Sequence, residues 1–167
     1  MSICFYMRRS HLEVAQPVLR ALELYLQAVG PHALAWYPDT EGDWQQLDDA
    51  GWELQRRKML HPRGARLALH GSPNGVNGYA FRYQGWNPED LPVFSGDKDP
   101  ACAVAFFLPT EYLEEHGPAS VRKLALDLAT ALPFNSGHAG FSVHSTPDQP
   151  ALTGGLLLCA HRQAVET

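Results

Sequence analysis

Histidine is the residue type that most invites a chemical interpretation of this sequence, because imidazole binds metals and transfers protons near neutral pH. The chain has eight histidines; His138 and His144 lie six residues apart, and His116, Glu115 and Asp148 could join them. A helical metal site needs a spacing such as H-E-x-x-H, which places two imidazoles on one face. No segment has that spacing, so we expect no metal or other cofactor and expect His138 to be a turn residue. A small metal-dependent hydrolase that uses His138, His144 and Glu115 stays open as an alternative.

The sequence supports nucleophilic catalysis no better than it supports a metal site. Ser136 lies in Asn-Ser-Gly, whereas a nucleophile elbow needs G-x-S-x-G between a strand and a helix. Cys102 falls within an apolar run, where a buried thiol is inert. Glu111, Glu114 and Glu115 could form an acid–base pair, but the solvated first turn of a helix favours such residues without any catalysis. The sequence therefore predicts a protein that is not an enzyme.

A stretch rich in acidic residues and tryptophan is more specific. Residues 21–55 contain seven Asp or Glu and no Lys or Arg, while the whole chain carries a net charge of −5. Aromatic anchors beside fixed negative charge suit a protein interface that meets a basic surface. The competing interpretation is that the tryptophans are core residues and the acids are solvated caps and loops. The predicted contact residues are Trp36, Asp39, Glu41, Asp43, Trp44, Asp48 and Asp49.

The elements that must position these residues follow from hydrophobic periodicity and from turn and capping residues. Ser10 and Glu13 form a capping-box pattern before the first helix, in which Pro17 indicates a kink or a regular start near Gln16. The predicted strands cover residues 3–7, 34–37, 66–70, 79–84, 102–108 and 140–144.

Three further helices are expected after the first one. Asp48 or Asp49 could cap a helix that runs to about residue 60, and its C-terminal cations favour the helix dipole without any nucleic acid. Thr110 is the predicted N-cap of a short helix that Gly117 ends, and a longer helix then runs to Leu132. Residues 135–137 are predicted to turn the chain, and residues 146–167 to form an irregular tail with at most a short helix at 156–163.

Together these elements predict an α+β fold: a single domain (1–167) whose mixed or largely antiparallel sheet has helices packed on it. No run of about eighteen apolar residues exists, so no membrane span is expected. No secretory signal precedes the first strand, and Cys4, Cys102 and Cys159 are widely spaced. These features indicate reduced thiols in a cytoplasmic protein.

Several segments carry a family resemblance that covers roughly residues 3–145. They are FYMRR (5–9), WYPDTEGDWQQLDDAGW (36–52), GYAFRYQG (78–85), FFLPTEYLEEHGP (106–118) and LALDLATALPFNSGHAGFSV (124–143). The chain resembles the type VI secretion immunity family (TsiV-type), whose members guard bacteria against nuclease and other toxins. The resemblance implies a non-enzymatic cytoplasmic protein that binds and blocks a cognate toxin, and the acidic and tryptophan-rich residues are then the expected toxin contacts.

The chain also departs from the family pattern. Family members usually continue well past the strand near His144 and begin with a lead-in before the first strand. The chain is therefore interpreted as a truncated member, one half of a larger unit, or a compact variant. If an element is missing, a second copy could cover the exposed sheet edge. A homodimer or other assembly module without a toxin partner is the alternative function.

Overall fold

The computed structural model describes residues 1–73, 78–87 and 101–141, which form one sheet and three helices. The strands are β1 (Ser2–Met7), β2 (Trp36–Pro38), β3 (Trp44–Gln46), β4 (Ala65–His70), β5 (Ala80–Gly85), β6 (Cys102–Phe107) and β7 (Ser136–Gly140). The helices are α1 (His11–Val29), α2 (Asp49–Met59) and α3 (Thr110–Ala131). This architecture confirms the predicted α+β class. None of the helices in the described ranges is long and apolar enough to cross a membrane.

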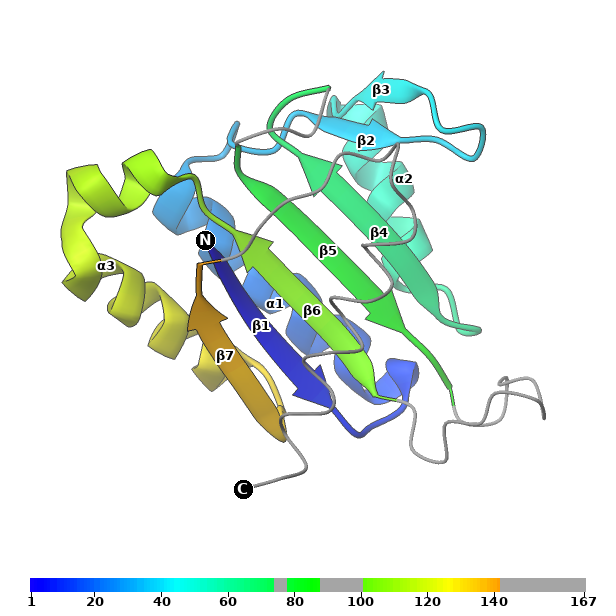
Figure 1. Ribbon diagram of the computed structural model, residues 1–167. Helices are drawn as coiled ribbons and strands as arrows, with labels where there is room; N and C mark the ends of the chain where they lie inside the picture. The colour runs from blue at the N-terminus through cyan, green and yellow to red at the C-terminus, as the bar shows by residue number, and fades with distance from the viewer. Residues whose placement is uncertain (74–77, 88–100, 142–167) are drawn as a thin grey trace.

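Every pairing in the seven-stranded sheet is antiparallel, and the strand order is β3-β2-β4-β5-β6-β1-β7. The first strand of the chain therefore lies between β6 and β7 (Figure 1). Strands β3 and β7 are the two ends of the sheet. The predicted sheet was mixed or largely antiparallel, and the antiparallel form is the one observed.

The core lies between one face of the sheet and the helices. Alternate residues of the central strands, among them Phe5, Phe81 and Phe106, are almost fully buried. Tyr25 of α1 packs against the Phe106 ring and donates a hydrogen bond to the Phe107 carbonyl oxygen. The opposite face of the sheet has no described helix on it, as the placement of α1 and α2 behind the sheet shows (Figure 1). One face is thus built for the core and the other is built mainly of half-buried side chains.

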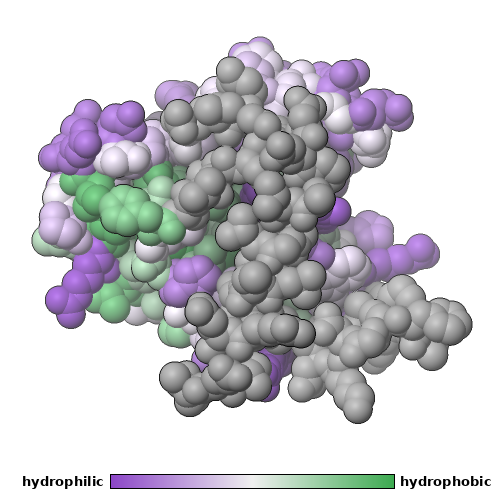
Figure 2. All heavy atoms as spheres, in the orientation of Figure 1, coloured by the Kyte–Doolittle hydropathy of each residue, from purple (hydrophilic) through white to green (hydrophobic). Residues whose placement is uncertain are grey.

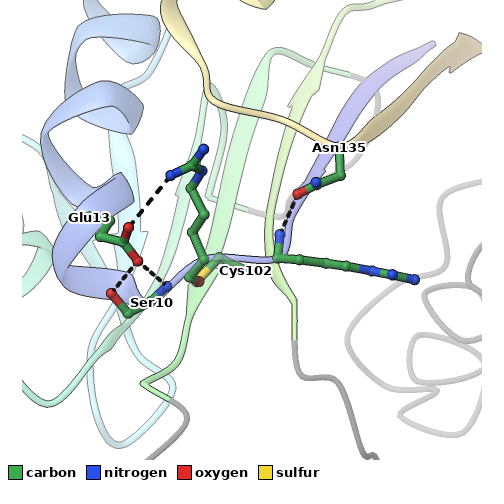
Figure 3. Close-up of polar contacts among 6 residues, drawn as sticks. Ser10, Glu13, Cys102 and Asn135 are labelled. Atoms are coloured by element: carbon green, nitrogen blue, oxygen red, sulfur yellow. Dashed lines mark hydrogen bonds and ion pairs between the residues drawn. The ribbon is translucent and has the colours of Figure 1, made fainter.

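Helix α1 begins as the capping-box pattern predicts. The Glu13 carboxylate accepts hydrogen bonds from the Ser10 amide at 3.0 Å and from its hydroxyl at 2.9 Å (Figure 3). These bonds with Ser10 hold the pKa of Glu13 below its ordinary value. The helix begins at His11 and continues through Pro17 without a break, so the later start near Gln16 is wrong.

The turn between β1 and α1 is also fixed from its other side. Asn135 accepts a hydrogen bond from the Arg8 amide at 2.7 Å, and the Cys102 thiol donates to the Arg9 carbonyl oxygen at 3.3 Å (Figure 3). Cys102 and Cys4 are free thiols, and burial raises the pKa of both. The third cysteine lies outside the described residues.

Helix α3 consists of two helical pieces, as predicted. Gly117 has φ 74° and ψ 167°, which is a conformation that glycine adopts without steric cost. Pro118 follows and starts the longer piece, where a missing amide proton is harmless. The N-cap prediction is wrong by one residue, because Pro109 holds the cap position and Thr110 is already helical.

The last described strand differs from its prediction. Residues 135–137 were expected to turn and 140–144 to form the strand, but β7 spans Ser136–Gly140 and pairs with β1. Gly137 pairs with Phe5 of β1, and a Cβ there would lie 2.9 Å from both the Cys4 carbonyl oxygen and the Phe5 ring, which explains why this strand position holds glycine. His138 is consequently an exposed strand residue rather than a turn residue. Residues 142–167, including the predicted tail and its short helix, lie outside the described ranges.

Candidate functional site

The hairpin β2–β3 carries the first group of predicted contact residues. The Asp39 carboxylate accepts hydrogen bonds from the Glu41 amide at 3.0 Å, the Asp43 amide at 2.9 Å and the Gln45 side chain at 2.8 Å. The Gln45 bond is the main reason that the pKa of Asp39 lies below its ordinary value. Asp39 therefore organises the loop, while Glu41 and Asp43 are exposed on it. The strand β3 that follows this loop was not among the predicted strands.

Helix α2 carries the second group. Its N-cap is Asp48, whose carboxylate accepts a hydrogen bond from the Gly51 amide at 2.8 Å. A Cβ on Gly51 would lie 3.0 Å from the Gln46 carbonyl oxygen and 3.1 Å from the Tyr37 ring. The helix start is thus packed directly on the hairpin, which explains a glycine that lowers intrinsic helix propensity. Asp49 is the first helical residue and is exposed.

The acidic residues therefore lie at both ends of the end strand β3. The loop acids precede this strand and the helix acids follow it, and three extended residues span roughly 10 Å. We call this set the acidic edge; it comprises Asp39, Glu41, Asp43, Asp48 and Asp49. Two of its carboxylates, those of Asp39 and Asp48, also hold local structure. The structure brings the five predicted acids to one border of the sheet.

The tryptophans do not form one cluster with these acids. Trp36 pairs with His70 in register and Trp44 packs edge-on against the His70 ring at 5.0 Å, so both lie on the helix-free face. Tyr37 and α2 lie on the opposite face. Trp52 of α2 is half-buried on the helix side. The predicted mixture of aromatic anchors and acids is thus divided between the two faces of the sheet.

The side chains considered for metal binding or catalysis do not form a common site in the described residues. Within the described ranges no three His, Cys, Asp or Glu side chains lie close enough together to hold a metal ion. The His138 ring stacks on Tyr6 at 6.0 Å, and the His116 ring stacks on Tyr112 at 4.3 Å. His144 and Asp148, the other members of the metal hypothesis, lie outside the described residues. Ser136 is a strand residue, so the described geometry gives it no elbow.

A cavity between α1 and α2 was missed by sequence reasoning. Its volume is about 570 Å³, and we call it the helix groove. Gln55 lines it, is only 4% exposed, and its side-chain nitrogen has no hydrogen-bond partner. Gly51, Gln55 and Met59 form the buried stripe of α2 at four-residue spacing. A polar residue in the middle of such a stripe is the sequence signal that could have revealed the groove.

Comparison with known proteins identifies the family of this chain. A family model described as "Type VI immunity for VRR-NUC" (TsiV) matches residues 17–155. None of the curated proteins compared matches the chain. Among solved structures, the Pseudomonas aeruginosa T6SS protein PA0821 is similar with a TM-score of 0.67 and 16% identity, over 87% of this chain and 43% of that one. At this identity the likeness shows the fold, and the chain spans less than half the length of that protein. Because the family model covers most of its length, the chain belongs to the TsiV family of type VI immunity proteins.

Proposed function

We propose that the protein binds a cognate VRR-NUC nuclease toxin and neutralises it by covering its DNA-binding cleft with the acidic edge. The protein performs no catalysis in this role and acts in the cytoplasm of the cell that it protects. Membership of the TsiV family supports the immunity role. The observation that carries the choice of surface is the alignment of five carboxylates along the border of the sheet at β3.

The charge of the acidic edge fits such a partner. A nuclease must bind phosphate groups with Lys and Arg, which makes its cleft basic. Residues 21–55 contain no Lys or Arg, so the carboxylates of the acidic edge have no neighbouring cation along this stretch of the chain. Complementary charge of this kind raises the rate of association more than it slows dissociation. The hydrogen-bonded Asp39 and Asp48 would present these charges on a pre-ordered backbone, which reduces the entropy lost on binding.

A charge-reversal experiment tests this proposal. Glu41, Asp43 and Asp49 are exposed and make no structural hydrogen bond through their side chains, so all three are replaced by Lys. The association rate constant with the purified VRR-NUC domain of the cognate toxin is measured at low and high salt. We expect a loss of at least about tenfold at low salt, because electrostatic steering contributes factors of 10 to 10³. The difference should shrink as salt screens the charges. Inhibition of DNA cleavage should weaken in parallel.

The chain offers a control with the same change of net charge. Glu111, Glu114 and Glu115 of α3 are exposed, and replacing all three by Lys should leave association within about twofold of the wild type. Equal losses in both triple variants would mean that only net charge matters. No loss in either would place the toxin contact elsewhere, while co-expression survival would still report on immunity itself.

One observation favours a second candidate function, self-association. Strand β7 is an end of the sheet, and its central residues are exposed. Figure 2 shows an apolar patch over α3, beside this end of the sheet. Exposed apolar residues in this region of the chain are Leu126 at 56%, Phe134 at 41% and Phe141 at 78%. A second copy could cover such a surface, and a strict monomer by light scattering at micromolar concentration would exclude it.

A further inference from the structure

A group of exposed apolar side chains lies away from the apolar patch at α3 and β7. It consists of Leu12 at 64%, Leu60 at 41% and Trp86 at 40% exposure. The segments that carry them meet at the buried His11. The His11 backbone amide donates a hydrogen bond to the Trp86 carbonyl oxygen at 2.9 Å, and the His11 ring lies against the backbone of the two residues that flank Leu60. The three side chains thus belong to one region of the surface, although they are far apart in sequence.

Two arginines border this region. The turn after α2 packs on the end of β5, because a Cβ on Gly64 would lie 3.8 Å from the Trp86 Cα, and Arg63 belongs to this turn. Arg66 pairs in register with Gln84, two residues before Trp86. Both arginine side chains are exposed. We call this surface the arginine patch; it comprises Leu12, Leu60, Arg63, Arg66 and Trp86.

The positive charge of the arginine patch is not neutralised by neighbouring acids along the chain. Residues 56–88 contain six Lys or Arg and no Asp or Glu. Neither Arg63 nor Arg66 belongs to an ion pair within the described residues. Tryptophan and arginine are the residue types that most often dominate the binding energy of protein interfaces. An apolar surface bordered by Arg therefore suits a partner that presents an aromatic or apolar side chain among carboxylates.

The chain itself carries a surface of that chemistry, the acidic edge, with the half-buried Trp44 on the strand between its two groups of acids. The two surfaces lie at opposite ends of the molecule (Figure 1). Strand β2 pairs with His70, the last residue of β4, whereas Arg66 lies at the start of β4. Helix α2 starts at the acidic edge and ends beside Leu60, and its eleven residues span about 16 Å. One copy cannot bring its own two surfaces together, but two copies can.

We propose that the arginine patch of one copy binds the acidic edge of a second copy. The contact is heterologous, because each copy contributes a different surface, and it leaves one acidic edge free at the end of every assembly. The acidic edge is also the surface proposed above for the toxin, so toxin and second copy compete for it. This competition rests on the proposed function, whereas the self-association does not. Toxin that binds the acidic edge therefore dissociates the assemblies.

Charge reversal on each surface tests the contact, with sedimentation velocity and light scattering of the full chain. The base-reversed variant carries Arg63→Glu and Arg66→Glu, and the acid-reversed variant is the triple Lys variant of the acidic edge described above. Wild-type protein should associate at about 0.01 M salt and separate at about 1 M, where charges are screened beyond about 3 Å. Each variant should raise the Kd of self-association at least about tenfold. The chain with all five substitutions should associate to within about threefold of the wild type, because its charges match again.

Two further variants serve as controls. Arg20→Glu with Arg122→Glu makes the same change of net charge at exposed positions of α1 and α3, and should leave the Kd within about twofold of the wild type. Trp86→Ala should raise the Kd at low salt by about fivefold or more, as for a central apolar contact. It should leave the dependence on salt unchanged, because it removes no charge.

The outcomes separate this inference from the proposed function. A wild-type protein that stays monomeric at low salt, or a five-substitution chain that stays monomeric, would overturn the contact and leave the immunity function standing. Association that Leu126→Glu abolishes and the base-reversed variant retains would assign self-association to the β7 end of the sheet instead.

Addition of the purified VRR-NUC domain of the cognate toxin tests the competition. The domain should dissociate wild-type assemblies into complexes with one copy of this protein each. Toxin bound to intact assemblies would overturn the competition for the acidic edge. A domain that does not bind at all would overturn the immunity function, while self-association and its loss in the base-reversed variant would still be measurable.

Discussion

The two neighbouring aspartates at the start of α2 allow the structural and electrostatic roles of the acidic edge to be separated. Asp48 accepts the Gly51 amide proton at 2.8 Å, whereas Asp49 is exposed in the first turn. Asp48→Ala removes both the cap and the charge, Asp48→Asn keeps a capping oxygen and removes the charge, and Asp49→Asn removes only a charge. Loss of a cap costs about 1 kcal/mol, and loss of a favourable charge near the helix start costs about 0.3–1 kcal/mol.

These magnitudes predict an order that urea unfolding and thermal melting can check. Asp48→Ala should lower the free energy of unfolding by about 1–2 kcal/mol, which for a chain of this size is a fall in melting temperature of roughly 2–8 °C. The two Asn variants should lose less than about 1 kcal/mol and resemble each other. All three variants should slow association with the toxin to a similar extent, because each removes one charge. Equal stability of Asp48→Ala and Asp48→Asn would refute the capping role. Slower association of Asp48→Ala alone would refute the electrostatic role.

Two further predictions concern the buried contact at the end of β5. A Cβ on Gly85 would overlap the Tyr83 hydroxyl and His11 Nδ1, which are hydrogen-bonded to each other at 2.8 Å. Gly85→Ala should therefore lower the free energy of unfolding by about 3 kcal/mol or more, whereas Gly140→Ala, with open space around its Cβ, should stay within about 0.5 kcal/mol; a mild Gly85→Ala would contradict the packing. Burial lowers the pKa of His11 below its ordinary value of 6.5, so the unfolded chain binds the proton more readily and stability should fall as pH drops below 6.5. The fall should be no steeper than about 1.4 kcal/mol per pH unit for this one group, and urea unfolding between pH 7.5 and 5.5 should show it reduced in His11→Gln.

Sequence patterns predicted the long elements because these carry their own signals. The capping pair before α1 and the glycine break at Gly117 are both local, and both are confirmed. The wrong predictions concern residues whose secondary structure depends on tertiary contacts. Residues 135–137 have the composition of a turn, yet Gly137 pairs with Phe5 of β1, whose ring leaves no space for a side chain at that position. Strand β3 has only three residues, too few for a periodicity to appear.

The candidate site was predictable in charge but not in shape. The five acids stand out because no cation interrupts them, and the structure places them along one border of the sheet. Trp36 and Trp44 lie on one face of the sheet and α2 on the other. This separation could not be predicted, because it depends on which residue of a short strand faces the core. The helix groove was equally hidden, since its walls come from α1, α2 and β4, which are distant in sequence. An unpaired glutamine becomes visible only when its surroundings are known.

The position of β1 has a consequence for synthesis of the protein. This first strand pairs with β6, which starts at Cys102, and with β7, which starts at Ser136. When the chain leaves the ribosome, β1 must therefore wait for both neighbours, and such long-range pairing folds slowly. The elements of the acidic edge, β2, β3 and α2, are made early and lie within a short stretch of sequence. Newly made protein thus contains the segments of the acidic edge well before the sheet that supports them can close.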